Sequence, residues 1–187
     1  MKKLINISIV CLIIFSGALK VQAQDPGNII KVNYLSLVVS TINVAYEKGL
    51  SEKTSGQFQF YYWMGGKVGD VQYGGFGVTP EFRFYPSGNA LRGFFLGPFI
   101  RYQNWSIEDT EPDPVSGLQA KGTYQSFGGG VVLGGQFVFG DVVSLDIWGG
   151  PAFNSGSVTY EDNADGNISV TGDGFTFRFG TTVGLAF

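Results

Sequence analysis

Six charged residues stand out because each lies inside a segment in which bulky apolar residues alternate with small or polar ones. Charged side chains in such positions have two uses. Two carboxylates can serve acid–base catalysis or an ion path, whereas carboxylates matched with cations can form a network of ion pairs. Three acids face three bases here, which favours the paired network. The residues are Glu47, Glu81, Arg83, Arg101, Asp146 and Arg178.

Histidine is absent from the chain. Its absence excludes Ser-His and Cys-His nucleophilic catalysis and removes the commonest metal ligand. The one cysteine, Cys11, lies near the N-terminus, outside every alternating segment. We therefore predict no catalytic residue, no cofactor and no metal site. Calcium is the alternative for the acidic stretches around Glu108–Asp113 and Asp162–Asn167, but the second lacks the regular spacing and distal glutamate of a calcium loop.

The segment Gly174–Phe187 shows the alternation most clearly. One set of positions carries mostly phenylalanine and other bulky apolar residues, and the other set carries glycine, threonine and alanine around Arg178. A period of two indicates a β-strand with one apolar face. Small residues on the second face are typical of the inside of a narrow barrel, and the apolar face then suits lipid.

Other segments with this period follow one another along the chain. They are separated by connections that alternate in length, as in outer-membrane barrels, whose short turns face the periplasm. We predict an all-β fold, a transmembrane antiparallel up-and-down β-barrel of eight strands. The first candidate strand, Ile29–Val38, can also be a helix or a continuation of the next strand. The other strands are Thr41–Lys48, Gln57–Met64, Gly77–Tyr85, Gly93–Trp105, Ser126–Phe139, Val143–Trp148 and Gly174–Phe187. The short connections are Gly49–Thr54, Pro86–Arg92 and Gly140–Asp141, and the long ones are Gly65–Gln72, Asn104–Lys121 and Ser155–Ser169.

The N-terminal residues have the pattern of a secretory signal peptide. Lys2 and Lys3 precede the apolar run Leu4–Leu19, and Val21-Gln22-Ala23 resembles a cleavage site. We expect residues 1–23 to be removed and residues 24–187 to form a single barrel domain; an uncleaved membrane helix is the alternative. The net charge of −3 gives no basic face, so we expect no nucleic-acid partner.

Four motifs resemble those of a group of small outer-membrane β-barrel proteins. They are Asn43-Val-Ala-Tyr-Glu-Lys-Gly-Leu-Ser-Glu-Lys, Thr79-Pro-Glu-Phe-Arg-Phe-Tyr, Gly93-Phe-Phe-Leu-Gly-Pro-Phe-Ile-Arg-Tyr and the terminal Gly184-Leu-Ala-Phe. The resemblance implies an eight-stranded barrel of the general OmpA/OmpX shape. It brings no established substrate or catalytic residue. The final Phe187 also resembles the end of Gram-negative outer-membrane barrels, which implies an assembly signal.

These observations predict a non-enzymatic protein of the cell outer membrane. We expect a structural or surface-binding role through extracellular loops, with the lumen plugged by side chains. The expected partners are outer-membrane lipid, the barrel-assembly machinery through the C-terminal strand, and an unknown extracellular ligand. Three alternatives stay open: an outer-membrane enzyme, a narrow channel, and a secreted lipocalin-like carrier of a small apolar ligand. In that carrier the bulky faces would point inward and the six charges would point to water.

Overall fold

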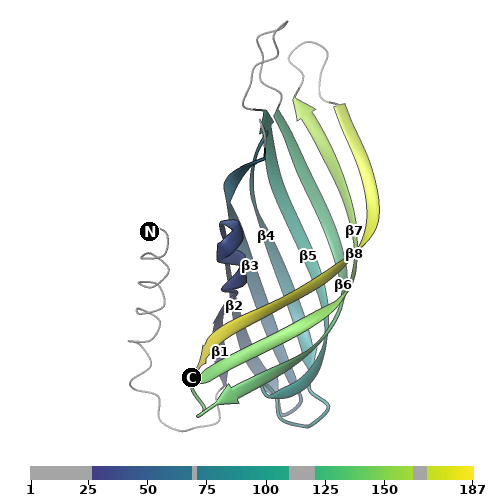
Figure 1. Cartoon of the computed structure of the whole chain (residues 1–187). Helices are drawn as coiled ribbons and strands as arrows, with labels where there is room; N and C mark the ends of the chain where they lie inside the picture. The colour runs from purple at the N-terminus through teal and green to yellow at the C-terminus, as the bar shows by residue number, and fades with distance from the viewer. Residues whose placement is uncertain (1–26, 69–70, 110–120, 162–167) are drawn as a thin grey trace, which may run out of the picture.

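The computed structural model describes residues 27–68, 71–109, 121–161 and 168–187. Eight strands pair antiparallel with their neighbours in sequence order, and β8 returns to pair with β1, so the sheet closes into a barrel (Figure 1). The predicted all-β up-and-down barrel of eight strands is confirmed. The strands are β1 (Asn28–Val32), β2 (Thr41–Ser51), β3 (Thr54–Val68), β4 (Val71–Phe84), β5 (Gly93–Asp109), β6 (Lys121–Phe139), β7 (Val143–Glu161) and β8 (Ile168–Ala186).

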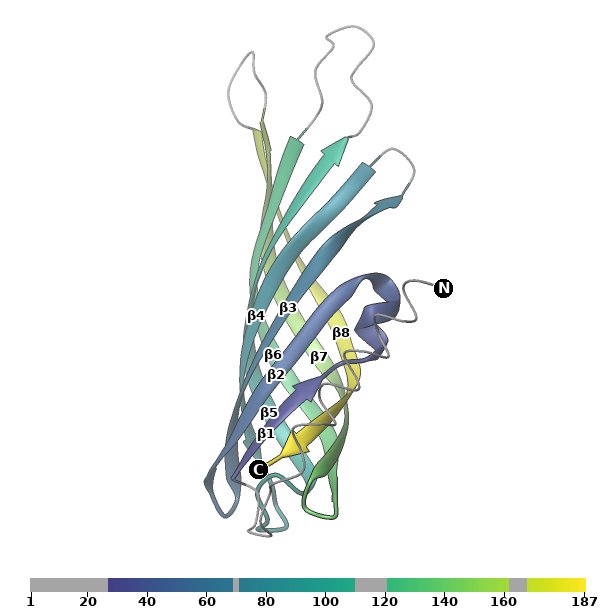
Figure 2. The same ribbon diagram turned by 90° about the vertical axis from the view of Figure 1, so that its left-hand side faces the viewer.

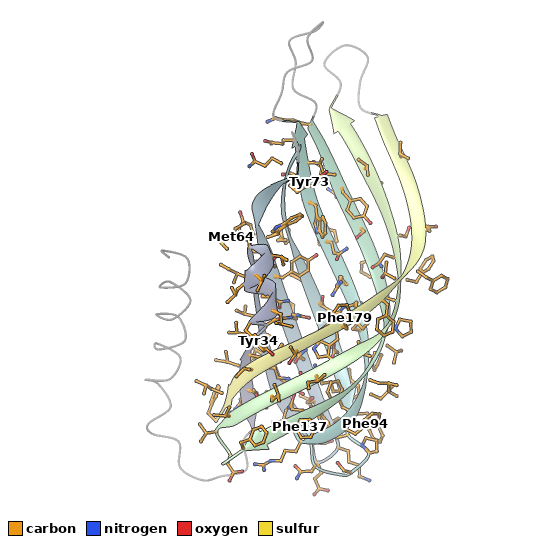
Figure 3. All side chains as sticks on the ribbon, viewed as in Figure 1. Tyr34, Met64, Tyr73, Phe94, Phe137 and Phe179 are labelled. Carbon is orange, nitrogen blue, oxygen red and sulfur yellow. The ribbon has the colours of Figure 1, made fainter. Side chains whose placement is uncertain are left out.

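Apolar side chains cover the outside of the barrel, and the polar and charged ones turn inward. The labelled Met64, Phe94, Phe137 and Phe179 lie on the outer wall (Figure 3), and each is about half exposed or more. The alternate positions of the same strands are buried and include six fully or almost fully buried charged residues. This is the reverse of a soluble protein, in which bulky apolar residues fill the interior. The six are Lys31, Glu47, Glu81, Arg83, Asp146 and Arg178.

The first strand is short because the chain turns soon after it starts. The side-chain oxygen Oδ1 of Asn33 accepts hydrogen bonds from the backbone N–H groups of Leu35 and Ser36, at 3.1 and 3.2 Å. Such Asx turns compete with a β-ladder for the backbone. A short 3-10 helix, η2 (Leu35–Val39), follows, and Ser40 in the left-handed conformation leads into β2. The candidate Ile29–Val38 is therefore a strand in its first part and a helix in its last.

The three short turns and the C-terminus gather at one end of the barrel (Figures 1 and 2). The connection after β6 contains Gly140 and Asp141, both with positive φ, of 57° and 62°, as the tight turn of a β-hairpin requires. This agrees with the hairpin predicted at Gly140–Asp141. Among the described residues, no helix is long and apolar enough to cross a membrane.

The three long connections were predicted wrongly in extent. Those of their residues that the structure describes continue the strands: β3 runs to Val68, β5 to Asp109 and β7 to Glu161. A ladder uses backbone groups, so a run of polar side chains does not end a strand whose neighbour also continues. At about 3.3 Å per residue, the longest strands span ~60 Å, roughly twice the apolar thickness of a bilayer.

Candidate functional site: the barrel lumen

Two cations and three carboxylates meet in the lumen near the short-turn end. Arg83 on β4 donates from Nε to Glu81 Oε1 at 2.6 Å and from Nη1 to Asp146 Oδ2 at 2.8 Å. Lys31 on β1 also binds Asp146 Oδ2, at 3.0 Å, and binds Glu47. Six strands thus meet at one cluster, because β3 through Gln57 and β6 through Gln136 join β1, β2, β4 and β7. We call Lys31, Glu47, Glu81, Arg83 and Asp146 the charge plug.

Neutral side chains complete the bonding of the charge plug. The Glu47 carboxylate accepts hydrogen bonds from Ser55 and, at 2.7 Å, from the Tyr85 hydroxyl. Gln57 and Gln136 each accept from the Lys31 ammonium, and Gln136 donates to the Leu91 carbonyl at 2.7 Å. A buried charge is tolerated only when it is paired and hydrogen-bonded. The cluster therefore depends on all its members together.

Strand register explains why these residues meet. Side chains on one face of a strand recur every second residue, so Glu47 on β2 shares the inner face with Ala45, which lies opposite Lys31 of β1. Glu81 and Arg83 occupy successive inward positions of β4, and Gln57 lies directly opposite Glu81. Asp146 lies opposite Gln136. Even spacing keeps these charges on the inner face of each strand, and the register between strands brings the five to one level of the barrel.

The structure brings four of the six predicted charges together and separates the other two. Glu47, Glu81, Arg83 and Asp146 belong to the charge plug, whereas neither Arg101 nor Arg178 forms an ion pair with a described carboxylate. A single network of six was therefore wrong. The physical reason is depth: Arg101 and Arg178 lie nearer the long-loop end, where they bind Thr79 and Gln59 instead.

Lys31 is the functional residue that the sequence reasoning missed. Its segment was ambiguous between strand and helix, so no inward face was assigned to it. One signal was available: closing the barrel brings β2 and β7, with the inward acids Glu47 and Asp146, to either side of the first and last strands, and a nearby cation is needed to balance these acids. In the structure Lys31 is fully buried and binds both.

Aromatic side chains fill the lumen on both sides of the charge plug. The Arg83 guanidinium lies 4.0 Å from the centre of the Phe95 ring. Tyr85, Phe95, Phe99 and Trp148 form one buried cluster with Val132 and Ala152. Tyr85 and Phe95 come from the short-turn ends of β4 and β5, whereas Phe99 and Trp148 contact Arg178 on the side of the long loops.

Above this layer the lumen is hollow. A cavity of about 600 Å³ is lined by residues of β5, β6, β7 and β8, including Arg101, Trp105, Tyr124 and Arg178. Tyr61 and Trp105 point inward here, because the Trp105 indole N–H donates to the Tyr61 hydroxyl at 3.2 Å. We call this space the upper cavity.

The carboxylates of the lumen are poorly placed for acid–base chemistry. Each of the three is held by at least one cation within 3.0 Å. In the described part of the chain, no group of three or more Asp, Glu, His or Cys side chains is arranged to hold a metal ion. The calcium alternative concerned residues such as Asp162 and Asp165, which lie outside the described residues.

Fold and lumen together define a closed eight-stranded barrel with a polar, charge-paired interior and an apolar exterior. Residues 8–161 match the family described as "Protein of unknown function (DUF3575)", so the chain belongs to this family. None of the curated proteins matches it. One solved structure, the crystal structure of the N-terminal β-barrel domain of Pseudomonas aeruginosa OprF, is similar over 88% of this chain and 100% of that chain, with 12% identity and a TM-score of 0.37.

Proposed function

We propose that this chain is a small outer-membrane β-barrel protein without enzymatic activity. Its short turns would face the periplasm, its long-loop end would face the exterior, and the charge plug would close its lumen. Recognition of an extracellular ligand would take place at the loop end, where a rigid barrel displays loops of variable sequence. Residues 1–23 would direct export, and the C-terminal strand ending in Phe187 would engage the assembly machinery.

The distribution of polarity carries this proposal. An outer wall of phenylalanine, leucine and valine around a core of buried charges is unfavourable in water and favourable in lipid, where apolar groups are tolerated outside. A soluble lipocalin-like carrier needs an apolar lumen and a polar outer wall. The observed faces are the opposite at Glu47, Arg83 and Asp146, which favours the membrane barrel.

The lumen also favours a closed barrel over a channel. Eight-stranded barrels have interiors just wide enough to be filled by side chains. Here Arg83 of β4 reaches across the lumen to Asp146 of β7, Lys31 binds the same carboxylate, and the Phe95 ring packs against Arg83. A permeating ion would have to displace paired charges, at a cost of several kcal/mol.

Cell fractionation tests the proposed location. We expect the full chain, expressed in a Gram-negative host, to be recovered in the detergent-extracted outer membrane and to show heat-modifiable mobility in gels. Recovery in the soluble periplasmic fraction would contradict the proposal. Deletion of residues 2–23 is the matched control, since it should retain the chain in the cytoplasm without changing the barrel sequence.

A further inference from the structure

The upper cavity contains a buried guanidinium whose hydrogen bonds are incomplete. Arg178 is only 6% exposed. Its Nη2 donates to Gln59 Oε1 at 3.1 Å, but Nε and Nη1 have no hydrogen-bond partner among the described residues. The rings of Phe99 and Trp148 hold the guanidinium carbon at 4.2 and 4.7 Å from their centres. A fixed buried cation with unused donors is unfavourable unless an anion completes it.

Arg101 adds a second positive charge to the same cavity. It donates to Thr79 Oγ1 at 3.2 Å and to Gln103 Oε1 at 3.4 Å, which are neutral groups. The acid in the cavity wall, Asp173, is exposed. The cavity therefore presents two cations against one solvated carboxylate, a balance that favours an anionic ligand.

The barrel wall is open beside this cavity. β8 pairs with β7 along nearly its whole length but with β1 only from Val183 to Ala186. Because β1 ends at Val32, the rest of β8 has no strand on its other side within the described residues. Figures 1 and 2 both place the upper part of β8 away from η2 and β2.

The cavity reaches this opening. Thr176, which faces inward, and Phe177, which faces outward, both line it. That is possible because β8 is an unpaired edge at this height. Three phenylalanines flank the edge with exposed fractions well above those of the other outward rings: Phe175 at 84%, Phe177 at 68% and Phe179 at 77%. The upper cavity thus connects the two arginines inside the barrel with the exposed phenylalanines on its outer surface.

We propose that the upper cavity binds a single-chain anionic amphiphile, a long-chain fatty acid. Its carboxylate accepts hydrogen bonds from Arg178 and Arg101, and its acyl chain leaves through the side opening along Phe177. The cavity volume of about 600 Å³ lies within the range of roughly 300–1,000 Å³ for small-ligand sites. The path of the chain rests on the proposed function, because the opening faces lipid only if the barrel lies in a membrane.

Fluorescence quenching tests the site. The mature protein in phosphatidylcholine nanodiscs is titrated with a fatty acid brominated on its chain, and Trp105 in the cavity wall reports binding. We expect saturable quenching. A brominated alcohol of equal length should bind at least ~10-fold more weakly, because it lacks the charge that strengthens hydrogen bonds to arginine. Equal affinity of the two, or no quenching by the acid, would overturn the proposal.

Two variants and one control locate the ligand. Arg178→Gln should raise the Kd of the fatty acid ~10-fold or more. Gly174→Phe should also abolish binding and leave the fold intact, because a Cβ at Gly174 meets nothing within 4 Å and the ring fills the cavity. Lys121→Gln, an exposed cation outside the cavity wall, should change the Kd less than twofold. Heat-modifiable mobility verifies folding. Unchanged binding by folded Gly174→Phe protein would refute the site.

A lipid headgroup offers the same anionic chemistry, and nanodiscs containing phosphatidylglycerol separate the two sources. If the site selects a free fatty acid, the Kd of the fatty acid in nanodiscs with phosphatidylglycerol stays within about threefold of its value in phosphatidylcholine. A rise of tenfold or more would mean that bilayer phospholipid occupies the arginines, and would overturn the fatty-acid proposal. The protein could also be recovered in the soluble fraction and still show quenching by the fatty acid in detergent. That result would support binding at the arginines and refute the membrane location.

Discussion

Lys31 Nζ lies 3.0 Å from Asp146 Oδ2, and this contact joins the first strand of the barrel to the seventh. The two residues are 115 positions apart, and both are fully buried. β8 pairs with β1 only near its end, so the ladder that closes the barrel is short. The ion pair links β1 to the other side of this ladder from inside the lumen. The seam between the ends of the chain therefore depends on a side-chain ion pair as well as on the ladder.

Replacing Lys31 by methionine should destabilise the barrel. Glu47 and Asp146 would each lose a cation, although Arg83 still reaches both. Removing one partner of a buried pair typically costs ~3–5 kcal/mol, so we expect about 3 kcal/mol in the free energy of unfolding, measured by urea titration in micelles. Lys48→Met, on the exposed face of β2, is the control and should change it by less than about 1 kcal/mol. A loss below 1 kcal/mol for Lys31→Met would show that the pair is solvated.

Arg83 in the charge plug should contribute more to the free energy of unfolding than Arg178 in the upper cavity. Arg83→Ala removes a cation bound to three carboxylates and should cost ~3–5 kcal/mol. Arg178→Ala leaves no carboxylate without its partner; it loses one hydrogen bond and two ring contacts, which we expect to cost below about 2 kcal/mol. The same urea titration compares them. Equal losses would mean that Arg178 does belong to the charge plug.

Lipid contact of the outer wall can be tested with a single charge. Ile100 lies outward on β5 and is about half exposed. Ile100→Arg should cost ~2–4 kcal/mol in lipid vesicles, as for arginine near the midplane of a bilayer. Gln125→Arg, at an exposed position nearer the long-loop end of β6, is the control at ~0–1 kcal/mol. If both substitutions leave stability unchanged, the wall faces water.

Phe187 has two separable roles. Its backbone N–H and carbonyl exchange hydrogen bonds with Asn28, at 2.9 and 3.0 Å, and its side chain is half exposed. Deleting Phe187 should impair both assembly in cells and refolding in detergent, since it removes bonds from a short seam. Phe187→Asp keeps those bonds and should impair assembly only, with export intact. Normal outer-membrane assembly of both variants would contradict an assembly signal in this residue.

The sequence predicted the barrel well because its evidence is local and repeated. Residues such as Phe175, Phe177 and Phe179 mark one face of a strand without any knowledge of its neighbours, and the eight-stranded ring follows from short turns such as Gly140–Asp141. The first strand could not be delimited, because the Asn33 turn depends on one side chain binding two backbone groups. Lys31 was missed for the same reason.

The division of the lumen into two levels could not be predicted either. Period two places Arg83, Arg101 and Arg178 on the inner face, and the structure agrees for all three. The depth of each side chain, however, depends on strand tilt and on the stagger between neighbouring strands. That stagger places Arg83 beside Asp146 and leaves Arg178 among Phe99, Trp148 and Gln59. Neither neighbourhood can be inferred from spacing along one strand.

Conductance across a planar lipid bilayer tests the closed lumen most directly. The unmutated mature protein, reconstituted in its heat-modifiable folded form, should give no steady channel, because Lys31 and Arg83 both bind Asp146 inside the lumen and Phe95 packs against Arg83. A protein with Arg83→Ala and Lys31→Met together should leak if it still folds. A stable open pore from the unmutated protein would contradict the account of a barrel closed by the charge plug.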